Sequence, residues 1–238
     1  MKTIVMIPTY NESENIAKLI QAIKQLPIKN LHVLVTDDNS PDETWKIVEK
    51  LSKKDKTIHL LRRMENKGRG LAGIAGFKEA LQLGADAIIE MDADYSHHPK
   101  YIPKLLEALH DGDMALGSRF VKGGSDGDRP LWRQFVTFGA NMYIKLFLGV
   151  KVKDCNSGYR CYKRKVLETI NLDTMIAKGP DIVQEILYKV HLKKFKIVEV
   201  PISFEERKEG KSKLGMKHLF KGYTMVLKLK FLHLVGKL

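Results

Sequence analysis

Short apolar strand patterns alternate with amphipathic helix patterns along the first 118 residues of this 238-residue chain. Parallel strands need a crossover segment between them, usually a helix, so regular alternation favours βα units. The chain therefore predicts an α/β fold with a mainly parallel central sheet flanked by helices. We expect strands at Thr3–Pro8, His32–Thr36, Thr57–Arg62, Ala87–Met91 and Asp113–Ser118, and helices at Glu14–Gln25, Glu43–Ser52, Gly70–Leu83 and Lys100–His110.

The alternation becomes less regular after Arg119. Residues 121–129 are rich in Gly, Ser and Asp and predict a loop, and residues 205–215 form a second, charged loop. We expect one domain over residues 1–215 and a separate C-terminal helical segment over residues 216–238. The expected elements in between are helices at Leu131–Leu148 and Asp181–Lys189 and strands at Ser157–Lys163 and Ile197–Phe204.

Composition places the chain among globular proteins. Its hydrophobic fraction is 44%, and no apolar run approaches the roughly 20 residues that span a bilayer. The first eight residues suit a strand better than an export signal, and two cysteines, Cys155 and Cys161, are too few for a disulfide framework. We therefore expect a reducing, cytoplasmic location.

The net charge of +13 is unevenly distributed. Residues 186–238 contain twelve Lys and one Arg against four Glu, a net charge of +9. Such a basic segment favours an anionic partner, either nucleic acid or anionic lipid. Lys217–Leu227 predicts a basic amphipathic helix that either packs on the core or lies on a membrane surface. Its basic face carries Lys217, Lys221 and Lys228, and its apolar face Leu219, Tyr223, Val226, Leu227 and Leu234.

Two aspartates, Asp92 and Asp94, follow the apolar strand pattern Ala87–Met91, with the small Ala93 between them. Ligands of open α/β sheets bind at the carboxyl ends of the strands. Mg²⁺ is commonly held there by one or two carboxylates together with substrate phosphates. An Asp-x-Asp segment is also common in ordinary turns and helix caps, so this motif alone leaves both interpretations open.

Four motifs at expected strand ends make the pattern more specific. They are Ile7-Pro8-Thr9-Tyr10-Asn11-Glu12, Asp37-Asp38-Asn39-Ser40-Pro41-Asp42, Asp92-Ala93-Asp94 with Ser96-His97-His98-Pro99, and Gly117-Ser118-Arg119. In this order, from Thr3 to about Leu219, the chain resembles the family-2 inverting glycosyltransferases. Within that family it is most similar to dolichol- or polyprenol-phosphate mannose synthases. The resemblance implies a GT-A type nucleotide-sugar-binding fold.

The resemblance also implies roles for individual residues. Asp38 matches the residue that recognises the base, with Asp37 as an alternative. Asp92, Ala93 and Asp94 match the site of a divalent metal, Mg²⁺ or Mn²⁺, and the diphosphate, with Asp92 and Asp94 as the metal ligands. The nucleoside pocket is implied at Pro8, Tyr10 and Glu12.

Basic residues are implied around the acceptor and the leaving group. Arg119 and Arg133 match residues near the transferred sugar and the acceptor phosphate, and with Asp94 they are the implied catalytic residues. Arg207 and Lys213 match a loop that closes over the diphosphate. The segments 154–160 and 179–185 depart from the family pattern.

The implied reaction is metal-dependent, inverting transfer of a hexose to dolichyl or polyprenyl phosphate, with mannose from GDP-mannose as the implied sugar and donor. A family-2 transferase that uses UDP-glucose or another UDP-sugar is the alternative enzyme. A non-catalytic nucleic-acid or anionic-membrane binding protein is the alternative of another class. The first hypothesis implies a peripheral enzyme at the cytoplasmic face of a membrane, no nucleic-acid partner, and docking either directly or through an anchoring protein.

A phosphate acceptor changes the demands on the site. A phosphate monoester has its second pKa near 6, so it is largely dianionic at pH 7 and needs no general base. If the acceptor is a hydroxyl instead, Asp181 or Glu185 is the candidate base. We expect structural roles for His97 and His98, and Lys67-Gly68-Arg69 is either a solvated loop or a contact to the nucleotide sugar.

Overall fold

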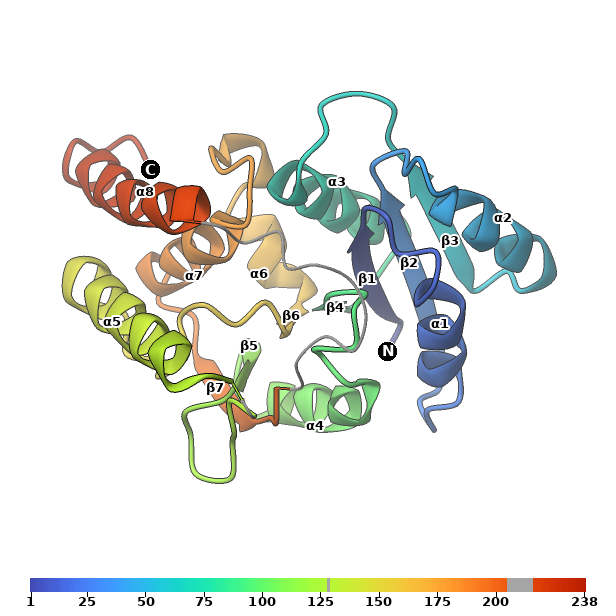
Figure 1. Ribbon diagram of the computed structural model, residues 1–238, viewed down its shortest axis with the longest axis horizontal. Helices are drawn as coiled ribbons and strands as arrows, with labels where there is room; N and C mark the ends of the chain where they lie inside the picture. The colour runs from blue at the N-terminus through green and yellow to red at the C-terminus, as the bar shows by residue number, and fades with distance from the viewer. Residues whose placement is uncertain (128, 205–215) are drawn as a thin grey trace.

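A seven-stranded sheet forms the centre of the computed structural model, which describes residues 1–127, 129–204 and 216–238, with the backbone alone for residues 216–219. Helices cover both faces of the sheet (Figure 1). The strand order is β3-β2-β1-β4-β6-β5-β7. The strands are β1 (Thr3–Thr9), β2 (Leu31–Asp37), β3 (Ile58–Arg62), β4 (Ala87–Glu90), β5 (Met114–Ser118), β6 (Arg160–Lys163) and β7 (Ile197–Pro201).

Most of the sheet is parallel, as the alternation predicts. β1 pairs in parallel with both β2 and β4, β2 with β3, and β5 with β7. β6 is the exception, because it lies between β4 and β5 and runs antiparallel to both. The carboxyl ends of β1, β2, β4 and β5 therefore meet at one edge, and β6 begins at that same edge.

The helices lie close to their expected positions. The expected helix at 100–110 is split into 3₁₀ turns on either side of a short α-helix, with Pro99 at its start. The α-helices are α1 (Ile16–Lys24), α2 (Thr44–Lys54), α3 (Arg69–Gln82), α4 (Ile102–Glu107), α5 (Leu131–Leu148), α6 (Arg164–Thr169), α7 (Ile182–Leu192) and α8 (Met216–Leu234). The 3₁₀ turns are η1 (Pro99–Tyr101), η2 (Ala108–His110) and η3 (Leu172–Thr174).

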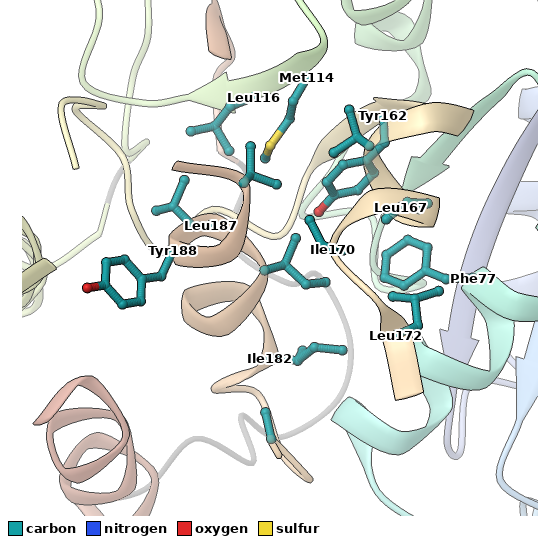
Figure 2. Close-up of a cluster of buried hydrophobic side chains, with 14 of the residues drawn as sticks. Phe77, Met114, Leu116, Tyr162, Leu167, Ile170, Leu172, Ile182, Leu187 and Tyr188 are labelled. Carbon is teal, nitrogen blue, oxygen red and sulfur yellow. The ribbon is translucent and has the colours of Figure 1, made fainter. Parts of the chain in front are cut away.

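Each face of the sheet has its own hydrophobic core. Successive side chains of a strand point to opposite faces, so Ile4 and Met6 of β1 enter one core while Val5 and Ile7 enter the other. Figure 2 shows the first core, where side chains from α3, β5, β6, α6 and α7 converge. The second core joins the sheet to α1, α2 and α4. Burial on both faces explains why these strands are apolar throughout.

Helix α8 packs against α5 and α7 on the side of the molecule away from α1 and α2 (Figure 1). Its inner face carries Met225, Val226 and Leu229, which join the first core. Leu227 and Leu234, which are expected on the same apolar face, are exposed, so only part of that face packs on the core. Helical periodicity predicts which residues share one face of α8. The positions of α5 and α7 determine which part of that helix is covered.

Two histidines pair across β2 and β3. His32 Nδ1 lies 3.0 Å from His59 Nε2, and His32 Nε2 lies 3.0 Å from Asn30 Oδ1. Asn30 Oδ1 can only accept, so the neutral His32 carries its proton on Nε2 and accepts from His59 through Nδ1. Burial and the nearby Lys2 lower the pKa of both rings, while Asp55 opposes that shift. Protonation of His32 would place two N–H groups against each other unless His59 moved its proton to Nδ1.

We expect this pair to make folding stability depend on pH. Because the folded-state pKa values lie below the ordinary value of about 6.5, the stabilisation is complete above pH 6.5 and is lost as the pH falls through the folded pKa values. The midpoint of thermal unfolding should therefore fall between pH 7.5 and pH 5.5, and His32→Gln should flatten that fall. The exposed His110 provides the matched control, since His110→Gln should leave the slope unchanged. Equal slopes in wild type and His32→Gln would contradict the assignment.

Candidate active site

Three loops with left-handed residues meet at the carboxyl edge of the sheet. Asn11, Asn39 and Tyr95 follow β1, β2 and β4, with φ angles of 60°, 52° and 61°. Asparagine tolerates this conformation, but tyrosine rarely adopts it. Backbone strain of this kind persists only where the surrounding structure imposes it, and it is often found at functional sites. The loop after β4 contains the Asp-x-Asp segment.

The loops after β1 and β2 are tied to each other. The backbone N–H of Asn11 donates to Ser40 Oγ at 3.0 Å, and that of Glu12 donates to Thr44 Oγ1 at 3.0 Å. Pro8 is buried within β1, whereas the side chain of Tyr10 is 44% exposed. Tyr10 therefore lies at the surface of this edge, where it is expected to line the nucleoside pocket.

Adjacent aspartates at the end of β2 have different surroundings. Asp37 is fully buried and accepts hydrogen bonds from Thr9 Oγ1 at 2.8 Å and from Ser40 Oγ at 2.7 Å, so it holds the two loops together. Asp38 accepts from the backbone N–H of Gly68 at 2.7 Å and pairs with Arg63. Burial raises the pKa of Asp38 above its ordinary value, against these two contacts. Both carboxylates are buried and have partners within the fold, so these contacts do not decide between them, and Asp38 stays the prediction for nucleoside recognition.

The Asp-x-Asp segment places two carboxylates differently. The Asp92 side chain is 36% exposed, and its Oδ1 accepts from Arg69 Nη2 at 3.2 Å. Asp94 is nearly buried, and its Oδ1 accepts from both the backbone N–H and the hydroxyl of Ser96, at 3.0 and 2.6 Å. Ala93 between them is buried.

The donor set fits a divalent cation only in part. Within the described ranges, no group of three or more His, Cys, Asp or Glu side chains is arranged to hold a metal ion. Two carboxylates at a strand end do fit a hard cation that takes its other ligands from phosphate oxygens and water. The residues present therefore suit a cation that binds together with a phosphorylated ligand.

His97 lies at the centre of these charges. It is buried, its ring stacks on Tyr159 with centroids 4.9 Å apart, and its Nδ1 accepts from the backbone N–H of Asp92 at 3.1 Å. Burial lowers the pKa of His97, although the carboxylates of Asp92 and Asp94 oppose that shift. A neutral ring with its proton on Nε2 satisfies this geometry. His97 thus fixes the backbone from which the two carboxylates project.

Arg119, at the end of β5, forms the basic side of the site. Its guanidinium makes a bidentate pair with Asp154, at 2.7 and 2.8 Å, and contacts Asp126 at 3.0 Å. Asp154 is fully buried, so this pair fixes the cation in one orientation. Arg133 lies in the first turn of α5, with its guanidinium 5.3 Å from the Trp132 ring centre. Arg207 and Lys213 lie outside the described residues.

The family model described as glycosyl transferase family 2 matches residues 4–170. The chain belongs to this family. Among curated relatives, the polyprenol monophosphomannose synthase of Mycolicibacterium smegmatis is 39% identical over 216 residues, which is 90% of this chain and 81% of that protein. The dolichol-phosphate mannosyltransferase of Pyrococcus furiosus is 42% identical over 224 residues, which is 92% of this chain and 61% of that protein.

Solved structures confirm the GT-A fold. Glucosyl-3-phosphoglycerate synthase from Mycobacterium tuberculosis has a TM-score of 0.67 at 18% identity, covering 98% of this chain and 79% of that one. A mannosyltransferase from Pyrobaculum calidifontis, solved with GDP-Man and Mn²⁺, has a TM-score of 0.61 at 17% identity, covering 99% and 64%. The expected family, fold and enzyme class are thus confirmed, and the chain is a glycosyltransferase.

The structure adds residues that the motifs did not single out for the transferase site. Glu90 is fully buried on β4 and pairs with Arg69 at 2.9 Å, and Asp154 holds Arg119. A charged residue inside the apolar run Ile88–Met91 is a signal for a buried ion pair, and Glu90 could have been found by it. Asp154 lies in a segment without periodicity, so only the fold reveals its partner.

The two candidate bases on the acceptor side have structural contacts. Glu185 is fully buried, accepts from the backbone N–H groups of Ile176 and Ala177, and pairs with Lys189 at 3.6 Å. Asp181 Oδ1 accepts from the backbone N–H of Gly179 at 3.1 Å. Glu185 therefore holds α7 to the segment before it.

We expect Asp154→Ala to destabilise the transferase by about 3–5 kcal/mol, because it leaves the Arg119 guanidinium buried without its bidentate partner. Urea denaturation measures the change in unfolding free energy. Asp173→Ala provides the control, since its ion pair with Lys78 is solvent-exposed and should contribute less than about 1 kcal/mol. A loss below 1 kcal/mol for Asp154→Ala would show that the buried pair does not support Arg119.

Proposed function

We propose that the chain catalyses inverting transfer of mannose from GDP-mannose to a polyprenyl or dolichyl phosphate, with Mg²⁺ or Mn²⁺ bound at Asp92 and Asp94. The observation that carries this proposal is that Asp92 and Asp94, which follow β4, and Arg119, which follows β5, lie at the same edge of the sheet. A site of this kind suits two phosphorylated ligands. The names of the curated relatives support the sugar and the acceptor class.

We assign binding of the nucleotide-sugar donor to the residues at the carboxyl edge of the sheet. Tyr10 and Glu12 contact the nucleoside with Pro8 beneath them, and Asp38 accepts from the base. The carboxylates of Asp92 and Asp94, with the small Ala93 between them, would hold the cation. That cation would supply the positive charge that stabilises the leaving nucleoside diphosphate. Arg207 and Lys213 add positive charge to the same group.

The acceptor side requires no general base. A lipid monophosphate is largely dianionic at pH 7 and is already a nucleophile. The protein must instead bring two anions together, which Arg119 and Arg133 accomplish by contacting the acceptor phosphate. The bidentate contact with Asp154 keeps Arg119 in place as the charge on the phosphate changes.

We expect Asp94→Asn to keep the fold and to lower turnover by orders of magnitude, because the amide lacks the charge that binds the cation. Thermal shift with GDP and Mn²⁺ measures binding: wild type should gain stability from the two together, and Asp94→Asn should lose most of that gain. Asp111→Asn, at an exposed position, should behave as wild type. Full activity in Asp94→Asn would refute the metal site, and stabilisation by UDP but not GDP would identify a UDP-sugar transferase instead.

A membrane surface is required because the acceptor's tail stays in lipid. In the described ranges, no helix has the length and hydropathy to cross a bilayer. Helices α5 and α8 pack together through Tyr143 and Tyr223, whose rings are 4.8 Å apart, and they occupy one side of the molecule (Figure 1). Both expose large apolar side chains. These are Leu131, Trp132, Phe135, Phe138, Met142 and Leu146 on α5, and Phe220, Leu227, Phe231 and Leu234 on α8.

The spacing on α5 is that of one helix face. Positions 131, 135, 138, 142 and 146 recur at intervals of three or four residues. Monomeric proteins rarely expose apolar patches of this extent without a partner. Lys221 and Lys228 are exposed on α8, which adds attraction to anionic lipid. We therefore propose that α5 and the C-terminal segment 216–238 dock peripherally on the cytoplasmic face of a membrane.

We expect Phe135→Ser with Phe231→Ser to abolish co-sedimentation with anionic vesicles, because each lost phenylalanine contact removes about 2 kcal/mol of apolar burial. High salt should weaken wild-type binding only in part. Met64→Ser, exposed in the loop after β3, is the matched control and should bind as wild type. Undiminished vesicle binding by the double variant would place the docking surface elsewhere.

A further inference from the structure

Arg69 forms ion pairs with two carboxylates that differ in burial. It is the first residue of α3, and its Nη2 lies 2.9 Å from Glu90 Oε1 and 3.2 Å from Asp92 Oδ1. Glu90 and Asp92 are two positions apart, so both project toward α3 from the end of β4. One nitrogen thus bridges a carboxylate of the core and a carboxylate of the proposed cation site.

The Glu90 end of this bridge is fixed. Glu90 is fully buried at the end of the central strand β4, and its Oε2 also accepts from the Tyr162 hydroxyl at 3.4 Å. A buried carboxylate that loses its cation is strongly destabilised, so Arg69 cannot leave Glu90 without a large cost. Asp92 is partly exposed, and it is therefore the end that can change partners.

The fold also makes room for the Arg69 guanidinium. A Cβ at Gly73 would lie 3.3 Å from Arg69 Nη1 and 3.1 Å from Ile182 Cδ1. Arg69 Nη1 itself is buried and makes no hydrogen bond within the described part of the chain. An orphaned buried donor is unusual, because such groups are nearly always satisfied. Leaving Nη1 without a partner costs free energy, so the ion pairs with the two carboxylates must determine the position of the Arg69 side chain. The charges of these carboxylates also raise the pKa of Arg69, against the effect of burial.

The ion pair with Arg69 affects Asp92, the first of the two proposed metal ligands. In the free protein, Asp92 is neutralised by a cation that the fold supplies, so a divalent ion must compete with Arg69 for its Oδ1. Glu90, Asp92 and Asp94 together outnumber the one guanidinium, so the region stays negative, but Asp92 Oδ1 already has a cationic partner. A nucleoside diphosphate offsets that competition, because its phosphate oxygens add negative charge and are the ligands that a hard cation prefers.

We infer that Arg69 is a positioning residue that makes cation binding at Asp92 depend on the bound nucleoside diphosphate. The inference rests on the proposed function, since it assigns a regulation to the same site. Linkage requires the effect to be reciprocal: if the diphosphate raises the affinity for the cation, the cation raises the affinity for the diphosphate by the same factor. Arg69 therefore lowers the affinity of the free protein for the cation and in this way increases the coupling between the cation and the diphosphate.

The test measures Mn²⁺ binding by electron paramagnetic resonance, without and with saturating GDP. Arg69→Met should bind Mn²⁺ about tenfold more tightly than wild type in the absence of GDP, within the usual range of such couplings, and should show a smaller gain on adding GDP. Arg69→Lys keeps the cation and should behave as wild type. Arg164→Met removes one charge from an exposed pair with Glu168 and is the control for net charge.

A second variant covers the chance that Arg69→Met fails to fold with Glu90 unpaired. Arg69→Met with Glu90→Gln removes both charges of the buried pair and should show the same tighter binding of Mn²⁺ in the absence of GDP. Unchanged or weaker binding of Mn²⁺ in both variants would overturn the inference. A loss of GDP affinity measured without metal would also overturn it, because Arg69 would then contact the diphosphate directly.

The proposed function fails separately from the inference. If wild type binds neither Mn²⁺ nor GDP, the proposed donor site is wrong. If wild type binds both with strong coupling and the Arg69 variants keep that coupling, only the role of Arg69 is wrong.

Discussion

Parallel pairing of β1 with β2 and β4 is the constraint on which the site depends. The registers Thr9 with Asp37 and Met6 with Glu90 bring the ends of the three strands to one edge. Asp38 and Asp92 follow those ends, so they meet there although 54 positions separate them in the chain. A shift of one residue in either register would turn the alternating core side chains to the wrong faces. Core packing on both faces therefore also fixes the geometry of the site.

Charge pairing is the second common feature of the site. Asp38 pairs with Arg63, Asp92 with Arg69, and Asp154 with Arg119. The fold thereby holds acidic and basic groups at close range before any ligand binds. Pairs that are fully buried, such as Asp154 with Arg119, stay intact, whereas the exposed Asp92 can exchange its partner.

Local sequence patterns predicted most of the fold because they depend on neighbours in the chain. The strands and helices of residues 3–118 lie where periodicity and strand-end motifs place them. Patterns could not show that β6 enters the sheet antiparallel between β4 and β5, nor that Asp154 reaches Arg119, because both depend on the path of residues 120–160. They also could not show that Leu227 and Leu234 stay exposed, since the covered side of α8 is set by α5 and α7. The roles of Arg69 and Glu90 depend on one contact between α3 and β4.

The most direct test of the account is the identity of the product. The protein should be incubated with GDP-mannose, Mn²⁺ or Mg²⁺ and a polyprenyl phosphate, with UDP-glucose and a polyprenol in parallel reactions. We expect a polyprenyl-phosphate mannose of inverted anomeric configuration by mass spectrometry and nuclear magnetic resonance, and no product from the alcohol. Transfer from UDP-glucose alone, transfer to the polyprenol hydroxyl, or retention of configuration would contradict a base-free site built for two phosphates.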